Sequence, residues 1–135
     1  MATQSILSIF NNHLVEFVED VERVFPDDVD IKSAKNSILL MKKTNPKLVP
    51  NIWYRNVAKP YREQIERGDI AFFLEKDYTS DCARHGHGQK IMESIDKLRD
   101  PIKNMTIEDQ EKTMQYVQNL SNICYNYSNE LLQNS

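Results

Sequence analysis

Apolar residues recur at steps of three and four along most of this chain, the spacing that places side chains on one face of a helix. The clearest stripe runs over residues 4–25 and consists of Ile6, Phe10, Leu14, Phe17, Val21 and Val24. Only three glycines among 135 residues, and no alternating runs of Val, Thr and Tyr, argue against strands. The sequence therefore predicts an all-α fold: a single compact helical bundle of about five to seven helices over residues 1–135.

Prolines and capping residues divide the pattern into helices. Pro26 ends the first helix, because the residue before a proline is disfavoured in helical geometry. Possible N-caps for a second helix, which ends near Lys43, are Asp27, Asp28 and Asp30. Residues 46–67 predict two short helices, the second of which begins at Pro60. Gly68 is expected to close that helix in the left-handed conformation, and Asp69 to cap the next one.

The second half of the chain begins with a segment without periodicity, residues 77–88, which predicts a loop. The following helix has a stripe of Ile91, Ile95, Leu98 and Ile102. Pro101 should kink or end it. Thr106 followed by Asp109 is typical of a helix start. The final stripe predicts a bundle helix, because it is too short for an autonomous coiled coil; it consists of Val117, Leu120, Cys124, Tyr127 and Leu131.

The N-terminal residues lack the basic start and the apolar block of a signal peptide. No apolar run approaches the roughly 20 residues that span a bilayer. Cys82 and Cys124 are too few for a disulfide framework, so we expect both to be thiols. These features predict a protein that is not secreted and has no membrane partner.

One short segment combines residue types that bind metals. Cys82, His85 and His87 lie within six residues, with glycines that would let the loop fold around an ion. A structural zinc site normally has four ligands, and no second pair follows at the usual spacing. Arg84 within the loop also opposes a cation. We therefore expect an exposed loop and no cofactor, with a zinc site at these three residues as the weaker alternative.

Charge is unevenly distributed along the chain, whose net charge is −3. Residues 1–31 hold seven acids and one base, whereas residues 32–67 hold nine bases and two acids. Such a distribution indicates what a surface attracts rather than which reaction it performs. The predicted partner-binding residues are these nine bases and an adjacent tyrosine: Lys32, Lys35, Lys42, Lys43, Lys47, Arg55, Lys59, Arg62, Arg67 and Tyr54.

Three interpretations of this basic segment remain open at the level of sequence. A protein partner is favoured, and simple neutralisation by the acidic first helix is an alternative. Nucleic acid is the third, because lysines and arginines neutralise phosphates and Trp53, Tyr54 and Tyr61 interleave with them as a stacking surface would require. The acidic net charge and the place of Trp53 on an apolar stripe count against nucleic acid.

No catalytic signature accompanies the basic segment. There is no Gly-x-Ser-x-Gly turn around a nucleophile and no glycine-rich loop followed by lysine that would hold a phosphate. His13 lies beside the apolar stripe of the first helix, where we expect it at the boundary of the core. The sequence therefore favours a protein that is not an enzyme.

Three strings carry a resemblance to a known group of proteins: FVEDVERVFPDD at residues 17–28, KTNP at 43–46 and GDIAFFLEKDY at 68–78. They resemble small helical proteins encoded by large nucleocytoplasmic DNA viruses of algae and protists, over most of residues 10–125. That family has no assigned activity, and the resemblance transfers no functional residue. It implies a protein of the virion or the host-cell cytoplasm, for which a minor capsid or cementing role, with capsid subunits as partners, is the expectation.

Overall fold

The structure is a computed structural model that describes residues 2–75 and 89–126, and every regular element within these ranges is a helix. The all-α prediction is therefore confirmed. In chain order the elements are α1 (Ala2–Val24), α2 (Val29–Thr44), α3 (Leu48–Trp53), the π-helical η1 (Tyr54–Ala58), α4 (Arg62–Glu66), α5 (Ile70–Glu75), α7 (Gln89–Lys103) and α8 (Ile107–Asn126). Among these helices, none is both long and apolar enough to cross a bilayer.

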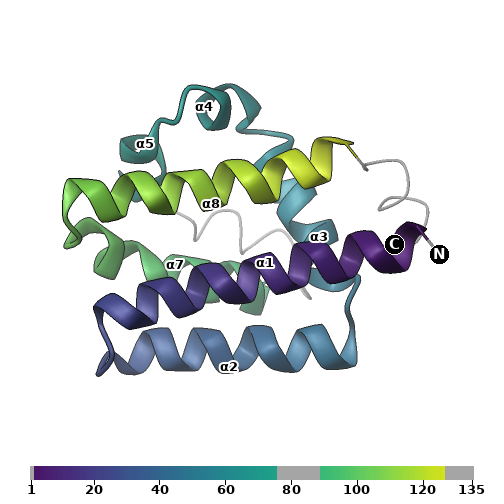
Figure 1. Cartoon of the computed structure of the whole chain (residues 1–135), viewed down its shortest axis with the longest axis horizontal. Coiled ribbons are helices and arrows are strands. Elements are labelled where there is room, and N and C mark those ends of the chain that lie inside the picture. The colour runs from purple at the N-terminus through teal and green to yellow at the C-terminus, as the bar shows by residue number, and fades with distance from the viewer. Residues whose placement is uncertain (1, 76–88, 127–135) are drawn as a thin grey trace.

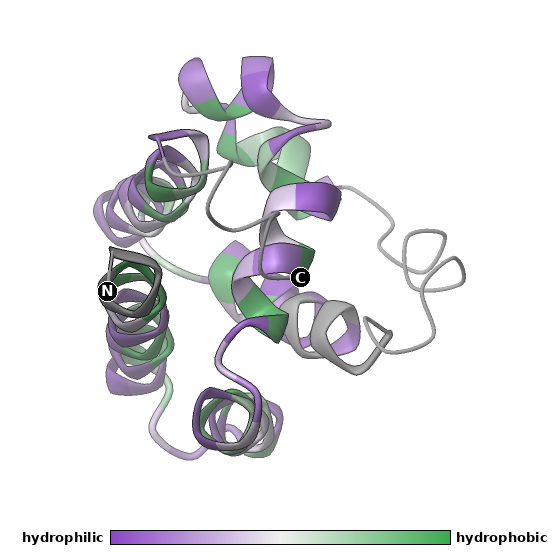
Figure 2. Ribbon diagram, turned by 90° about the vertical axis from the view of Figure 1, so that its right-hand side faces the viewer, coloured by the Kyte–Doolittle hydropathy of each residue, from purple (hydrophilic) through white to green (hydrophobic). Residues whose placement is uncertain are grey.

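The long helices run roughly parallel or antiparallel to the long axis of the molecule (Figure 1). α1 and α2 form an antiparallel pair; α8 packs along the other side of α1, and α7 packs against α2. α3 and η1 lie toward the end at which α2 finishes. α4 and α5 lie beyond α8, so that α2 and α4 are on opposite sides of the molecule in both perpendicular views (Figures 1 and 2).

The predicted helix starts are confirmed by side-chain caps. The Asp28 carboxylate accepts a hydrogen bond from the backbone N–H of Ile31 at 3.1 Å, which satisfies one of the unpaired donors at the start of α2. Asp69 caps α5 in the same way, and Thr106 caps α8. Gly68 has a φ of +68°, the left-handed conformation that closes α4 and that glycine adopts without steric cost.

The segment between α2 and α4 differs from its prediction in one respect. α3 continues into η1 without a break, and α4 begins at Arg62 rather than at Pro60. In η1 the backbone N–H of Lys59 donates to the carbonyl of Tyr54 at 2.9 Å, five residues back. Pro60 has no N–H with which to continue the ladder, so the helix widens and then ends. The Tyr125 hydroxyl donates to the carbonyl of Ala58 and satisfies an acceptor at this end of η1.

The core is formed by the predicted stripes. Five members of the α1 stripe are buried, Val24 packs partly against them, and Ile31, Ala34 and Ile38 provide the buried face of α2. Figure 2 shows hydrophobic residues on the inward sides of the helices. Leu98 and Ile102 are buried in α7, which contains Pro101 and ends two residues later, at Lys103.

Some predictions fall on parts of the chain about which the structure gives no information. The side chains of Ile91 and Ile95 are not described. The predicted loop over residues 77–88 lies outside the described residues, and so do Tyr127 and Leu131 of the final stripe. The described members of that stripe, Val117, Leu120 and Cys124, belong to the core or pack against it.

A charged network joins α1 to α8. The Asp20 carboxylate accepts hydrogen bonds from Lys112 Nζ at 2.9 Å and from Arg23 Nε at 3.3 Å, and its side chain is only 9% exposed. Arg23 also lies 3.7 Å from a carboxylate oxygen of Asp109. Because Asp20 is largely withdrawn from water, its hydrogen bonds are worth more than those of an exposed ion pair.

Asp20→Asn is expected to lower the free energy of unfolding by about 1–2 kcal/mol, because the amide cannot replace a carboxylate that accepts from two cations. Urea unfolding at neutral pH measures this change. Glu66→Gln provides the control. The side chains of Arg62 and Glu66 are each 60% exposed, so loss of this ion pair should change the free energy of unfolding by less than about 0.5 kcal/mol. Equal effects from the two substitutions would contradict a stabilising role for the Asp20 network.

Candidate interaction surface

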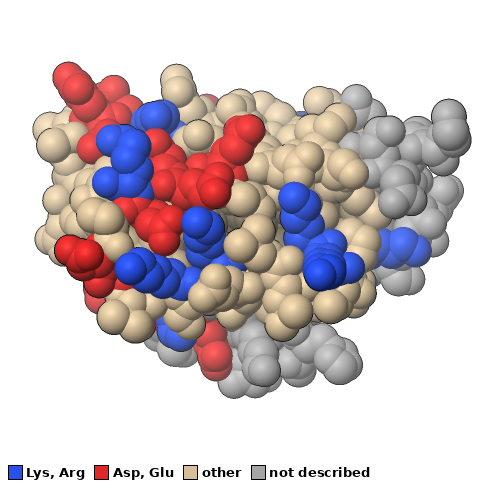
Figure 3. Space-filling view, turned by 60° about the horizontal axis from the view of Figure 1, so that its bottom comes forward, with Lys and Arg blue, Asp and Glu red and all other residues tan. Residues whose placement is uncertain are grey.

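Charge is segregated along the long axis of the molecule. Residues 31–62 contain no acid, and they form most of α2, all of α3 and all of η1. α1 has no acid before Glu16, and α8 has none after Glu111 through Asn126. The described parts of α1, α2, α3, η1 and α8 nearest the α2–α3 connection therefore contribute no carboxylate. Figure 3 shows this from the α2 side: red and blue atoms intermix on the left, whereas blue atoms on the right have no red neighbours.

The nine predicted cations do not share one face. Lys32, Lys35, Lys42 and Lys43 are on α2. Arg62 is on α4 and Arg67 is its C-cap, on the opposite side of the molecule (Figure 1). α2 and α4 are close in sequence but do not pack together. α2 packs on α1, α3 and α7, whereas α4 packs on α8, α5 and η1. The predicted residues must therefore be considered as separate groups.

Lys35, Arg62 and Arg67 lie near carboxylates of the same chain. Lys35 Nζ donates to Glu22 at 2.9 Å and lies 3.7 Å from Glu19, so that the hydrogen bond to Glu22 raises the pKa of Lys35. The other two are at α4 and its C-cap: Arg62 pairs with Glu66, and Arg67 lies near Glu63 and Asp69. Neutralisation by the acidic first helix, one of the three interpretations, thus holds for Lys35.

A second group of cations lies in the part of the fold that contains the α2–α3 connection. We name it the basic end and define it as Lys42, Lys43, Lys47, Arg55 and Lys59. It spans the last turn of α2, the connection to α3, and η1. The four lysines form no ion pair with any described residue, and Lys43, Lys47 and Lys59 are exposed. Lys32, although exposed, lies in the first turn of α2, toward the acidic half of the molecule.

Exposed leucines accompany the lysines at the basic end. Leu40 is 62% exposed and Leu39 is 37% exposed. Leu40 and Lys43 are three residues apart on α2, a spacing that places them on one face of the helix. Sequence reasoning missed these leucines, although the run Ile38-Leu39-Leu40-Met41 carried a signal. The side chains of four consecutive helical residues point in directions all around the helix axis. Only those that face the core can be buried, so at least one of the four must be exposed.

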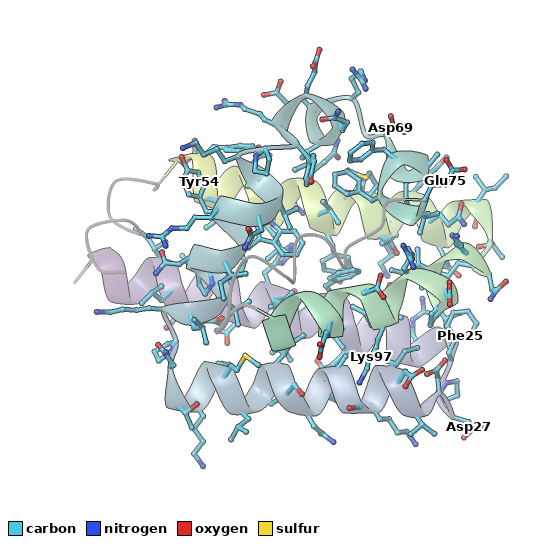
Figure 4. The ribbon with its side chains drawn as sticks, turned by 180° about the vertical axis from the view of Figure 1, so that it is seen from behind. Phe25, Asp27, Tyr54, Asp69, Glu75 and Lys97 are labelled. Atoms are coloured by element: carbon cyan, nitrogen blue, oxygen red, sulfur yellow. The ribbon has the colours of Figure 1, made fainter. Side chains whose placement is uncertain are left out.

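The aromatic residues do not form an open stacking surface. Trp53 is only 3% exposed and contacts Phe10 edge-on, which confirms its place in the core. Tyr61, Phe72 and Phe73 pack on one another with ring centroids 5.1–6.1 Å apart, and all three are partly buried. Tyr54 is half-buried on η1, at the end of the molecule opposite the α1–α2 turn (Figure 4).

Cys124 and His13 carry the thiol and imidazole groups of the described structure. Cys124 is fully buried, and burial raises the pKa of its thiol to about 12, so that it is neutral and inaccessible at ordinary pH. His13 is half-buried beside Tyr116, as predicted for the core boundary. Among the described residues, no cluster of His, Cys, Asp and Glu is arranged to hold a metal ion. The weaker zinc candidates, Cys82, His85 and His87, lie outside the described residues.

The basic end and its two leucines are therefore the best-defined candidate site in the described part of the fold. Comparison of the chain with protein-family models, with curated proteins and with solved structures finds no match in any of the three.

Proposed function

We propose that this protein works by binding rather than by catalysis, and that its basic end docks onto an acidic surface of a partner protein. The observation that carries the proposal is the combination of Lys42, Lys43 and Lys47, unpaired within the described structure, with exposed Leu39 and Leu40. The lysines would steer the encounter and set its orientation, whereas the leucines would supply apolar contact.

The leucines favour a protein partner over nucleic acid. Phosphate groups attract lysines through counterion release, but a nucleic-acid backbone offers little apolar surface for an exposed leucine. Single strands are usually held by stacking on aromatic rings. Here Trp53 is buried, Tyr61 packs on Phe72 and Phe73, and Tyr54 is half-buried. Binding to nucleic acid is therefore the alternative, and the experiment below distinguishes it.

The viral resemblance gives the proposal a more specific form. In that form the partner is a capsid subunit, and the protein is a minor capsid or cementing component of a virus particle. A small helical protein with a charged docking end suits such a role. Mass spectrometry of purified particles of the virus that encodes the chain should then detect it in constant ratio to the capsid protein. Absence from the particles would remove the capsid role without affecting docking by the basic end.

Lys42→Glu combined with Lys43→Glu is expected to weaken binding to a synthetic amphipathic helix of leucine and glutamate by at least about tenfold, which corresponds to roughly 1.4 kcal/mol. Fluorescence anisotropy with a labelled peptide measures this. The matched control is Lys32→Glu combined with Lys97→Glu, which makes the same change in net charge outside the basic end and should leave the affinity within about twofold.

Leu40→Ser separates the two kinds of partner. It should weaken binding to the peptide severalfold, because the apolar contact is lost, and it should leave binding to mixed-sequence DNA unchanged. Tight DNA binding that Leu40→Ser does not alter, together with no measurable peptide binding, would replace the proposed function by its nucleic-acid alternative. Loss of peptide binding that is equal in the Lys42/Lys43 variant and its control would reject the basic end as the site.

A further inference from the structure

We infer that the acidic surface bound by the basic end is the opposite end of a second copy of this chain, so that copies associate head to tail. This inference rests on the proposed function and names its partner. It is based on three observations: the segregation of charge along the long axis, the concave acidic surface at the α1–α2 turn, and the exposed apolar residues at both ends.

The receiving surface lies at the α1–α2 turn, and we name it the acidic end. A cleft of about 370 Å³ separates this turn from α7 and is lined by Phe25, Asp28, Asp30, Asp96 and Asp100, with Lys97 at the same cleft. Asp27 lies on the same turn and is exposed. Figure 4 shows Phe25 and Asp27 at one end of the molecule and Tyr54 of η1 toward the other.

Carboxylates at the acidic end are available for a partner. Asp27, Asp30 and Asp100 are exposed and form no ion pair with any described residue. Asp28 is occupied as the cap of α2, and Asp96 lies 3.3 Å from Arg99. These three carboxylates are opposite in charge and equal in number to Lys42, Lys43 and Lys47 at the basic end. Such complementarity favours one orientation of approach.

Apolar residues are exposed at both ends. At the acidic end Val29 is 76% exposed and Ile107 is 75% exposed, each as the first residue of its helix. Leu39 and Leu40 occupy the basic end. Four of the five large apolar side chains that are exposed in the described structure are thus these residues, beside the charges that would pair across the contact. Their burial would provide the affinity that exposed charges alone do not.

Head-to-tail contact follows from the charges. A two-fold dimer formed end to end would place each end against its own copy, and like charges would then repel. A contact between unlike ends is heterologous, and it leaves one free basic end and one free acidic end on every dimer. Further copies can therefore add, until the assembly closes into a ring or continues as a filament.

The test uses two variants of the full chain, each with one end reversed in charge. The first is Lys42→Glu with Lys43→Glu, which retains the acidic end. The second is Asp27→Lys with Asp100→Lys, which retains the basic end and leaves the Asp28 cap intact. Circular dichroism and thermal melting establish that both fold. Sedimentation velocity at low ionic strength then measures the size of the wild-type protein, of each variant and of their mixture.

The wild-type protein should form species larger than a dimer that dissociate as the salt concentration rises. Each variant alone should be monomeric, because its two ends carry charge of the same sign. Their equimolar mixture should associate again, because the retained acidic end of the first variant complements the retained basic end of the second, and the two reversed ends also complement each other. A monomeric wild-type protein at millimolar concentration, or variants that associate alone as well as they do together, would overturn the inference. Peptide binding by the basic end would in that case still support the proposed function, so the two failures are distinguishable.

Discussion

Trp53→Ala is expected to lower the free energy of unfolding by about 3–5 kcal/mol, the largest effect of any single substitution considered for this protein. The indole is 3% exposed, its ring lies edge-on to Phe10 at 6.1 Å, and its Nε1 donates to Ser121 Oγ at 3.1 Å across 68 residues of sequence. Trp53 also lines an apolar cavity of about 80 Å³ at the centre of the bundle. Alanine would enlarge that cavity rather than allow the core to collapse, which adds to the cost.

Two further variants separate packing from hydrogen bonding at this position. Trp53→Phe retains most of the apolar contact but leaves the buried Ser121 hydroxyl without its donor, at a cost of about 1–3 kcal/mol. Trp53→Phe with Ser121→Ala should recover part of that loss, because the unsatisfied group is removed. Urea unfolding followed by circular dichroism measures all three. A change below about 1 kcal/mol for Trp53→Ala would contradict the central place of the indole in the core.

Stability is expected to fall steeply at alkaline pH because of Cys124. Burial raises the pKa of its thiol from 9.0 to about 12, so that the folded chain retains a proton that the unfolded chain releases near pH 9. Below about pH 9 both states are protonated, and the contribution to stability is fully present. Between about pH 9 and pH 12 the unfolded chain binds fewer protons, so the free energy of unfolding decreases by about 1.4 kcal/mol per pH unit, to a total of about 4 kcal/mol.

Cys124→Ser isolates this effect from the titration of lysines. Serine does not ionise in this range, and its hydroxyl can donate to the Pro50 carbonyl, which the thiol contacts at 4.0 Å. Above about pH 9 the difference in stability between wild type and variant should shrink by about 1.4 kcal/mol per pH unit. Burial also raises the pKa of Tyr125 to about 12. Burial is the largest cause of that shift and is present in both proteins, so most of this contribution cancels, although Cys124 is itself a smaller cause. Parallel stability profiles of the two proteins from about pH 8 to pH 11 would contradict the prediction.

The leucines at the basic end show where sequence reasoning was incomplete. The run from Ile38 to Met41 contains four apolar residues in succession, and the sequence analysis singled out neither Leu39 nor Leu40 as a contact residue. The structure buries Ile38 and leaves Leu40 largely exposed, because α2 packs on α1 and α7 through one face. An apolar run that exceeds one helix face is therefore a usable signal for surface contact, even without an alignment.

The candidate site was predicted in part. Lys42, Lys43 and Lys47 were among the expected residues, and the structure leaves them unpaired with any described residue. Lys35, Arg62 and Arg67 were expected with them, but each lies near carboxylates of its own chain. The partners of Arg62 and Arg67 are within five residues in sequence and were visible as charge spacing. The partner of Lys35 is on another helix, so only the packing of α1 against α2 could reveal it.

The sequence by itself determined the helices, because helix formation depends on contacts within about four residues. Apolar spacing defined the buried faces, and caps such as Asp28, Gly68 and Thr106 fixed where elements begin or end. Only the tertiary structure decided which charged residues share a surface. That arrangement depends on how whole helices pack, and the packing placed α2 and α4 on opposite sides while collecting uncompensated lysines at one end. Local spacing carries no information about contacts between helices far apart in the chain, which is why the charge polarity of the molecule emerged only with its fold.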